Sequence, residues 1–459
     1  MGRVAWMNAA PFLVLFSVLH QAPYQVLNQE GAYSGQEAVS GESAAEDSPF
    51  TFFLSLEVGP LSLPSGTQGG GQDIFAFAKP IARMTKGESF ALELGAPLRL
   101  RLIDAEPKQS AQDFAAHLRR QDWDTTSDYG QVLRELRIGR DDTVANLRAG
   151  PLSAFTLGEG HLVDRYDNQL SPDYHPAGAL LTVNVGPTRV LVAASDILST
   201  RLFASELRLD IGRLASQQEK HFDRYHAIAS VAHDFGKVGE ESTESITAAL
   251  VGGDAALYKG EKLQLFAMGG AGSRVDAGTP DIGGFAGFSI RGLTGNVDVS
   301  GRLEGRYQGG SFRFGLFGPS YELARYSATG LHELPLAEER TDKNLAGFAE
   351  LKLGIGSGAK EELYLAASIA GEHFTTGRTD TDFTLALQLP GARTVATARV
   401  IVVGIGTQPR YSVRTELRQR ILDWLYVWGA GGTVHFPQPD GSLAKGYTAG
   451  LGAGVDFER

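Results

Sequence analysis

The sequence predicts an all-β protein, a closed antiparallel transmembrane β-barrel of about 16 strands, within roughly 14–18, with a short helical insertion. Three observations support this fold class. Segments in which apolar and charged residues alternate recur from residue 50 onward. Glycine makes up 57 of the 459 residues and recurs inside these segments, which favours a curved sheet. No apolar run reaches the length of about 18 residues that a membrane-spanning helix needs.

The clearest alternation lies at residues 296–318. One parity is apolar and the other is charged or polar, which is the pattern of a strand with one apolar face. The apolar set is Val297, Val299, Leu303, Tyr307, Phe312, Phe314 and Leu316. Opposite it stand Asp298, Ser300, Arg302, Glu304, Arg306, Ser311 and Arg313. We expect a hairpin with a short turn at residues 308–311, its apolar parity facing lipid and its charged parity facing a wet lumen.

The same alternation marks residues 91–102, 202–213, 345–356 and 411–420, and weaker versions of it occur elsewhere. The charged parity of these strands gives the predicted lumen-lining residues, which are Glu93, Arg99, Arg101, Glu206, Arg208, Asp210, Asp298, Arg302, Glu304, Arg306, Arg313, Glu350, Lys352, Arg414, Glu416, Arg418 and Arg420. Ten of them are basic and seven are acidic. Because charges at the lumen wall tune ion selectivity, the sequence predicts a weak anion preference.

The apolar faces of the strands must be covered either by lipid or by other parts of the protein, and the sequence favours lipid. Charged residues at every second position are costly in a dry core and inexpensive in water. The chain offers few helices to cover an apolar sheet face, although a second sheet in a soluble sandwich could do so. The aromatic residues Trp424, Tyr426 and Trp428 are typical of a lipid–water boundary, and a buried aromatic cluster is the alternative.

The N-terminal segment indicates export. Residues 1–22 have the order of a secretory signal peptide, with Arg3 before the apolar run Ala9–Leu19, and the cleavage site stays open. A buried N-terminal helix of a cytosolic protein is the alternative. Residues 23–49 are small, polar and acidic, which indicates a flexible leader. We therefore expect the barrel to be formed by residues 50–459.

One segment, residues 111–142, interrupts the strand pattern. Helical spacing occurs in two groups, Phe114, Ala115 and Leu118, then Tyr129, Val132, Leu133 and Leu136. Ser127 occupies an N-cap position for the second group. We expect two short helices or a helix-rich loop, lying either in the lumen as a partial plug or outside on the rim.

Residues 117–142, followed by Leu147–Gly178, resemble a group of largely uncharacterised porin-like outer-membrane β-barrel proteins of Gram-negative bacteria. In that group an Arg-Gly strand runs into a TLGxG turn and a loop with Tyr and Asn, and here the turn is TLGEG at residues 156–160. The resemblance implies the fold and an outer-membrane location, and it implies no catalytic residues. Many bacterial barrels end on Phe or Trp, whereas Phe457 here is third from last, so the assembly signal is imperfect.

Composition excludes several chemistries. The chain has no cysteine, so thiolate catalysis, cysteine-zinc sites and disulfides are absent. A net charge of -11 argues against a nucleic-acid partner. No nucleotide-binding motif or nucleophile elbow occurs. We expect no cofactor and no enzymatic activity.

Two clusters carry residual chemical hypotheses. The first gathers Glu159, His161, Asp164, Asp167, Asp173 and His175, which could hold calcium or zinc, although the spacing matches no defined site and a hydrated loop is favoured. The second is His233 beside Asp234, which with Ser230 or Ser195 could form a hydrolytic site on a barrel rim. A rim histidine bound by water is favoured there.

The function expected from these patterns is passive or weakly selective passage of small solutes across the outer membrane. The expected partners are outer-membrane lipid, the barrel-assembly machinery and small solutes. The alternatives are a non-conducting structural, adhesive or assembly barrel plugged by residues 111–142, an envelope hydrolase on a barrel scaffold, and a soluble periplasmic β-sandwich binding protein. Recovery in the outer-membrane or the soluble fraction separates the last alternative from the others.

Overall fold

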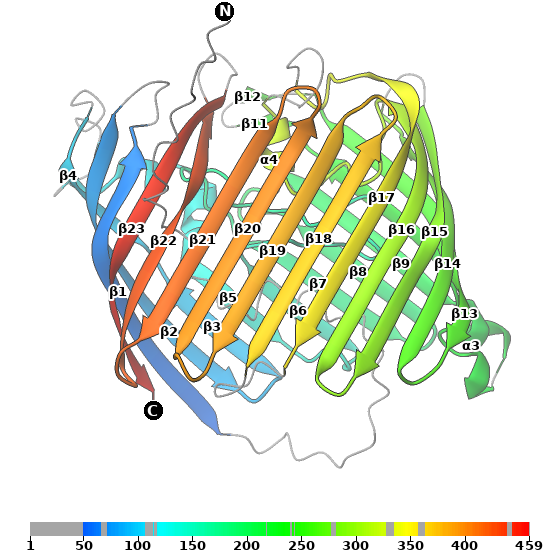
Figure 1. Ribbon diagram of the computed structural model, residues 1–459, viewed down its shortest axis with the longest axis horizontal. Coiled ribbons are helices and arrows are strands. Elements are labelled where there is room, and N and C mark those ends of the chain that lie inside the picture. Colours follow the sequence, from blue (N-terminus) through cyan, green and yellow to red (C-terminus); the bar gives the residue numbers. More distant parts are fainter. Residues whose placement is uncertain are drawn as a thin grey trace, which may run out of the picture.

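A closed β-barrel forms the body of the protein (Figure 1). The computed structural model describes residues 49–65, 71–105, 113, 117–216, 218–238, 241–242, 244–276, 281–326, 335–356, 363–437 and 443–458. The predicted signal peptide, and all of the predicted leader except Pro49, lie outside these described residues. None of the described helices has the length and apolar character needed to cross a membrane.

Neighbouring strands of the ring run antiparallel. The first part of the ring contains β1 (Phe50–Pro64), β2 (Gln72–Lys86), β3 (Phe90–Gly95), β4 (Leu98–Ile103), β5 (Leu133–Ile138), β6 (Ala145–Gly150), β7 (Gly178–Val185), β8 (Thr188–Ala194), β9 (Leu202–Asp210) and β10 (Tyr225–Asp234). The second part contains β13 (Ile246–Lys259), β14 (Leu263–Arg274), β15 (Asp281–Thr294), β16 (Val297–Gly310), β17 (Thr341–Ile355), β18 (Tyr364–Phe374), β19 (Thr379–Leu389), β20 (Thr394–Ile405), β21 (Arg410–Arg420), β22 (Leu425–Pro437) and β23 (Leu443–Glu458).

The remaining elements are short. A separate hairpin consists of β11 (Lys237–Val238) and β12 (Glu241–Ser242). The helices are η3 (Arg120–Asp122), η4 (Thr126–Val132), α3 (Ile211–Ala215), η5 (Glu219–His221) and α4 (Tyr321–Ala324), of which the η elements are 3-10 turns. All of them lie in connections between strands, so the β-sheet alone forms the framework.

The ring closes where the first strand pairs with the last. Phe53 lies opposite Glu458 and Ser62 lies opposite Ala449. β3 and β4 pair with the two halves of β2, so together they occupy one position in the ring. The described residues therefore form a barrel of 20 strands. The predicted fold class is confirmed, and the predicted count of about 16 is too low.

The alternation of apolar and charged residues is weak or hidden in β1, β2, β5 and β13, each for a local reason. Pro60 and Pro80 lie inside β1 and β2, and a proline in a run argues against an interior strand. β5 lies within the segment whose spacing predicts a helix. β13 has a glycine pair and many alanines, which weaken the alternation of its sequence.

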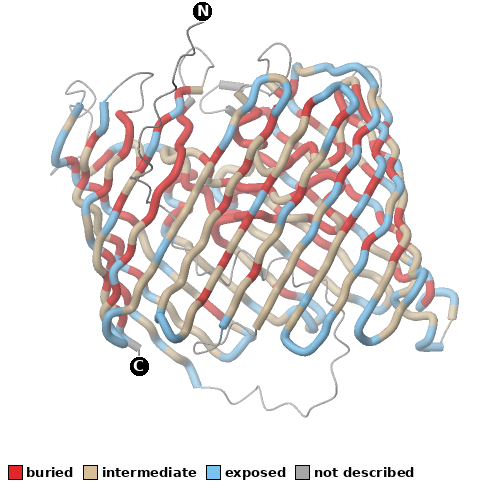
Figure 2. Tube along the Cα trace, viewed as in Figure 1, coloured by how far each residue is buried: buried red, intermediate tan, exposed pale blue. Residues whose placement is uncertain are grey.

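β16 has the two faces that its sequence predicts. Leu303 is 63% exposed and Tyr307 is 45% exposed on the outer surface. Arg302, Glu304 and Arg306 are buried on the lumen side. Figure 2 shows buried residues recurring along the strands, with exposed residues at the hairpin ends. The strand period of two thus separates an outer surface from a lumen surface.

The second half of that hairpin prediction is wrong. β16 ends at Gly310, and no strand facing lipid follows it within residues 311–326. Phe312, Phe314 and Leu316 are at most 2% exposed and belong to a buried apolar cluster. An apolar residue at every second position looks the same in a sequence whether it faces lipid or fills the interior.

The aromatic residues near β22 are divided between the two environments. Trp424 is 50% exposed in the turn before the strand, as expected at a lipid–water boundary. Tyr426 and Trp428 instead face inward and are buried. Trp428 packs edge-to-face on Phe77 with ring centroids 5.6 Å apart, and the Tyr426 hydroxyl donates to Glu57 at 2.8 Å. For these two residues the buried cluster is the correct alternative.

Residues 117–132 complete the barrel wall beside β4, where β5 and β6 are short. The backbone N–H of Arg119 donates to the carbonyl of Arg99 at 2.9 Å, and Leu100 and Leu118 form a β-bridge. The turns η3 and η4 then carry the chain to β5. The expected helix-rich insertion therefore consists, in its described residues, of two 3-10 turns and a strand. It contributes to the wall itself.

Candidate functional site

Two loops fold into the barrel and shape its lumen. The first inner loop, residues 151–177, connects β6 to β7. The second inner loop, residues 311–326 and 335–340, lies between β16 and β17 and contains α4. Both pack apolar side chains against the inward faces of β8–β15, in a cluster that includes Leu157, Leu162, Tyr166, Phe312, Phe314, Phe317, Tyr321, Leu191, Ala248, Leu250, Met268 and Phe285. A porin-type lumen is normally polar, so this cluster fills part of it.

The two inner loops are bonded to each other. The N–H of Phe317 donates to the carbonyl of Leu162 at 3.0 Å, and the N–H of Asp164 donates to the carbonyl of Phe317 at 3.2 Å. The buried hydroxyl of Tyr166, in the first loop, donates to the carboxylate of Glu322 in the second. Backbone and side-chain bonds together make the two loops one unit.

Acidic residues of the first inner loop pair with arginines on the wall. Glu159 lies 2.7 Å from Arg208 on β9 and 3.7 Å from Arg291 on β15. Asp167 lies 3.0 Å from Arg399 on β20 and also pairs with Arg414 on β21. These groups are largely withdrawn from solvent, where paired charges are held far more strongly than on a surface.

The wall anchors of the first inner loop stand on nearly opposite sides of the ring. Eight strands, β10 and β13–β19, separate β9 from β20 in one direction, which leaves ten of the 20 positions in the other. One loop therefore crosses the lumen from wall to wall. It divides the interior at its own level into two unequal parts.

A charged cluster on β16 holds the same loop from a third direction. Nε2 of His161 lies 3.1 Å from Oε1 of Glu304, and its imidazole stacks on Phe285 with ring centroids 3.8 Å apart. Nε of Arg306 donates to Glu304 at 2.8 Å. Arg302 lies 3.5 Å from Glu304 and completes the cluster. Each buried charge thus has an opposite charge beside it, as burial requires.

The second inner loop is fixed by buried polar contacts. The hydroxyl of Tyr321 donates to Asp234 at the end of β10, and Arg325 lies 2.9 Å from the same carboxylate. Nη1 of Arg274, on β14, donates to the carbonyl of Ala337 at 2.6 Å. Loss of one partner would leave the other buried and unpaired, so these contacts fix the position of the loop.

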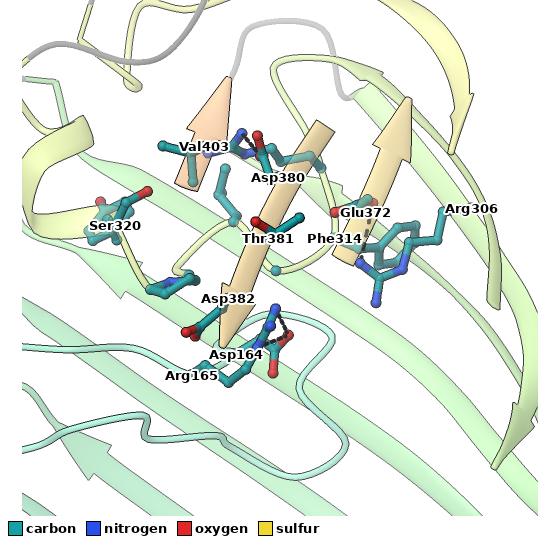
Figure 3. Close-up of a pocket in the computed structure, with 16 residues that line it drawn as sticks. Asp164, Arg165, Arg306, Phe314, Ser320, Glu372, Asp380, Thr381, Asp382 and Val403 are labelled. Atoms are coloured by element: carbon teal, nitrogen blue, oxygen red, sulfur yellow. Dashed lines mark hydrogen bonds and ion pairs between the residues drawn. The ribbon is translucent and has the colours of Figure 1, made fainter. Parts of the chain in front are cut away.

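A small cavity of about 50 Å³ lies where the two inner loops meet β18–β20, enough for a few water molecules (Figure 3). Its charged lining consists of Arg165, Arg306, Arg313, Asp164, Glu372, Asp380 and Asp382. Three guanidinium groups thus face four carboxylates. Because these charges nearly balance, the cavity fits a hydrated polar contact between the inner loops and the barrel wall.

Ionisation in the first inner loop follows from its ion pairs. Burial alone would raise the pKa of Glu159, but Arg208 and Arg291 outweigh burial and lower that pKa to about 2. Burial likewise opposes ionisation of Asp164, and Arg165 holds the pKa of that carboxyl below its usual value. Both carboxylates are therefore charged at neutral pH.

The predicted lumen-lining residues lie in several places. On β9, β16 and β17 lie Glu206, Arg208, Arg302, Glu304, Arg306, Glu350 and Lys352. Asp210 ends β9, where its side chain accepts a hydrogen bond from the backbone N–H of Arg213 in α3. On the other part of the wall, on β3, β4 and β21, lie Glu93, Arg99, Arg101, Arg414, Glu416, Arg418 and Arg420. Asp298 is exposed near the β15–β16 turn, and Arg313 belongs to the second inner loop.

Sequence reasoning missed the inward-facing charges on the strands that it did not recognise. They include Glu57 on β1, Asp73, Lys79 and Arg83 on β2, Arg134 and Glu135 on β5 and Asp254 on β13. Arg83 lies 2.9 Å from Glu135, and Lys79 lies 3.9 Å from Glu57. Charge alternation is present at residues 133–138, where Arg and Glu occur together, and would have indicated a strand there.

The loop considered for metal binding instead supplies counter-ions. Asp173 pairs with Arg119, and His175 lies 3.8 Å from Asp122. Its other acidic residues pair with arginines as described above. Across the part of the chain that the structure describes, no group of three or more His, Cys, Asp or Glu side chains is placed to hold a metal ion. The acidic residues of this loop therefore neutralise arginines of the lumen wall.

The candidate hydrolytic residues lie apart. Nδ1 of His233 is 2.8 Å from Oγ1 of Thr247. Ser230 lies on the opposite face of the same strand, β10, and its hydroxyl donates to Glu206 at 2.9 Å. Ser195 accepts a hydrogen bond from a backbone N–H of its own hairpin. Neither serine is in reach of the imidazole, so these residues do not form a nucleophile–base pair.

The fold and its interior define a closed β-barrel whose lumen holds a bonded pair of loops. No family model and no curated protein matches the chain. Among solved structures it is similar to a porin, with a TM-score of 0.32 and 10% identity over 89% of this chain and 100% of that chain. It is also similar to a BenF-like porin from Pseudomonas fluorescens, with a TM-score of 0.33 and 9% identity over 90% and 98% of the two chains. For OpdO from Pseudomonas aeruginosa the TM-score is 0.37, with 9% identity over 89% and 97%.

Proposed function

We propose that this protein is an outer-membrane channel that admits small polar solutes. The observation that supports the proposal is the combination of a closed 20-strand ring with an apolar outside and a charged inside. Large apolar side chains are exposed around the outer wall, among them Val251, Leu303, Leu351, Ile369 and Leu451. Barrels of about 16–18 strands already leave room for an aqueous channel, and this ring is wider.

The two ends of the barrel support an orientation in that membrane. Most turns at one rim are short, as between β7 and β8 and between β15 and β16, and the longer β9–β10 connection at that rim contains α3 and η5. Both inner loops start from the other rim. Short turns are periplasmic in outer-membrane barrels, so the inner loops would enter from outside the cell. Membrane lipid and the assembly machinery are then the proposed partners.

The test is electrical recording on the folded protein. Material from the outer-membrane fraction that migrates as a heat-modifiable band should conduct when inserted in a planar lipid bilayer. Absence of any conductance from such folded protein would contradict the channel. Recovery in the soluble fraction would contradict the membrane location itself.

A mild anion preference is proposed as the finer property of this channel. Arginines exceed carboxylates among the inward charges of β2, β5 and β21: this set includes Arg83, Arg134, Arg414, Arg418 and Arg420 against Asp73, Glu135 and Glu416. Asp167 and Asp456 from other elements pair with the arginines of β21 and reduce this excess. Fixed positive charge at a wall favours anions. The reversal potential in a KCl gradient should therefore have the sign of chloride selectivity, and the opposite sign would refute this proposal.

A barrel that does not conduct is the second candidate, because the inner loops carry an apolar core into the lumen. In that case the inner loops, and not residues 111–142, would form the plug. Replacing residues 311–340 with a short Gly-Ser linker separates the candidates. A silent protein that conducts only after this replacement is a plugged barrel, whereas a channel conducts before and after it.

A further inference from the structure

We propose that the outer surface of the barrel carries a binding site for the phosphate of a membrane-lipid headgroup, at the ends of β21, β22 and β23. The site consists of Tyr411, His435, Lys445 and Tyr447 and is called the lysine–tyrosine cluster. The inference rests on the outer-membrane location proposed above, and it holds whether or not the barrel conducts.

The lysine–tyrosine cluster lies at the rim from which the inner loops start. β16 leads into the second inner loop, and β22 runs in the same direction as β16 because neighbouring strands alternate in direction. β22 therefore ends, and β23 begins, at that same rim. In the orientation proposed above this rim faces the outside of the cell, so the headgroup belongs to the outer leaflet.

The outward face of β23 places the cluster at the lipid–water boundary. Tyr447 and Phe457 are both 59% exposed. The outward residues between them are all apolar, namely Ala449, Leu451, Ala453 and Val455. A stretch of about ten residues in a strand tilted by about 40° covers roughly 25 Å of membrane depth, which is the height of the apolar band in such barrels. Lys445 lies one outward position beyond Tyr447, at the level of the headgroups.

Lys445 brings a positive charge that has no carboxylate partner among the described residues. Its ammonium lies over the ring of Tyr411, and the ring centroid of Tyr447 is 5.7 Å away. The hydroxyls of the two tyrosines are 3.3 Å apart, so the rings meet across the end of β22. Aromatic faces hold a cation in position but carry no net charge. The lysine is therefore fixed in place and left without a counter-ion.

His435 adds a polar atom that has no partner. It lies directly opposite Lys445 in the pairing of β22 with β23, so both side chains leave the same face of the sheet. The residue is 3% exposed, and its Nε2 atom has no hydrogen-bond partner. The charged groups that act on the imidazole are Arg410 and Lys445, both positive. A buried polar atom needs a hydrogen-bond partner, and beside two cations an anionic oxygen fits best.

A phosphate group matches this set of donors. It carries negative charge and several acceptor oxygens, so it can accept from an ammonium, an imidazole and a tyrosine hydroxyl together. Anionic headgroups attract basic side chains that lie near the membrane surface. In a chain with a net charge of -11, a basic cluster without a neighbouring acid at this depth favours such a ligand.

Lys445→Gln and Lys445→Arg test the site, and Lys343→Gln is the matched control. Lys343 is also an exposed lysine near the start of a strand at the same rim, on β17, but it lies outside the cluster. The folded barrel in detergent is titrated with lipid A, a phosphorylated glycolipid, and bound lipid is counted by native mass spectrometry. A heat-modifiable band that is unchanged in lipid-free samples shows that each variant is folded.

Lys445→Gln should bind lipid A about five-fold more weakly than the wild type, which is the effect of one lysine near an anionic lipid surface. Lys445→Arg and Lys343→Gln should bind like the wild type. Unchanged binding by Lys445→Gln, or an equal loss in Lys343→Gln, would overturn the proposal. Displacement of lipid A by inorganic phosphate alone would also overturn it, because the site would then take free phosphate in place of a lipid.

These outcomes are separate from those that test the proposed function. Silent bilayer recordings contradict the channel and leave the lipid site standing. A folded barrel in the outer membrane whose Lys445→Gln variant binds lipid A normally contradicts the lipid site and leaves the channel standing.

Discussion

Leu303 and Ser300 of β16 have side chains on opposite faces of one strand. Arg at position 303 would enter the lipid, where the cost at mid-bilayer is about 2–4 kcal/mol, whereas Arg at position 300 would enter the lumen. We expect Leu303→Arg to lower the fraction of folded, heat-modifiable protein in lipid vesicles and Ser300→Arg to leave it unchanged. Equal loss in both variants would place both faces in the same medium.

Glu159 gives the first inner loop a dependence on acid. Its pKa is lowered from 4.5 to about 2, so its ion pairs stabilise the loop fully above pH 4.5. That stability is lost as the pH falls from 4.5 toward 2, because Glu159 in the released loop is protonated at a higher pH than Glu159 in its ion pairs. Protease sensitivity of the loop should stay constant from neutral pH to about 5 and rise below it. Glu159→Gln should be more sensitive at neutral pH and respond less to acid.

At the scale of elements, Asp167 is the anchor of the first inner loop on β20 and β21. Asp167→Asn leaves Arg399 and Arg414 with one carboxylate fewer, and breaking a buried pair costs about 3–5 kcal/mol. We expect a looser loop, seen as larger fluctuations of the open-channel current. Asp173→Asn is the comparison, since its side chain is 30% exposed and its partner Arg119 keeps a second carboxylate, Asp122, at 2.6 Å.

Strands were predictable from the sequence where one face meets lipid and the other meets charge, as in β16 and β21. The inner loops were not, because their apolar residues have no fixed period and their partners are distant. Phe312 and Phe314 imitate a lipid-facing strand, and Leu133 and Leu136 of β5 imitate a helix. The acidic residues of the first inner loop looked like metal ligands because the arginines that pair with them lie up to 247 positions away.

At the scale of the whole molecule, the closing strand carries the proposed recognition signal for assembly. Phe457 on β23 is 59% exposed on the outer surface, and so is Tyr447 on the same strand. If the assembly machinery reads the closing strand at Phe457, Phe457→Ala should reduce the amount of barrel in the outer membrane, and Tyr447→Ala should not. Equal amounts of all three proteins would mean that Phe457 is not read.

The overall fold was the most predictable level, because a period of two extended over hundreds of residues allows few architectures. The number of strands was less predictable, because single prolines and turn residues can interrupt the alternation that identifies a strand. The path of the first inner loop across the lumen could not be predicted from the sequence. It depends on Asp167 and Glu159 pairing with particular arginines on opposite sides of the ring, and the spacing of residues along the chain does not indicate which residues pair.

The first inner loop also sets an order for folding. Its residues are made early, but the arginines that hold Asp167 lie on β20 and β21, 232 and 247 positions later. Contacts between residues so far apart in sequence form slowly, since the intervening chain must first be arranged. Glu159 and His161 hold the same loop to β9 and β16, which come earlier in the chain. We therefore expect the Asp167 anchor to be among the last contacts of the lumen to form.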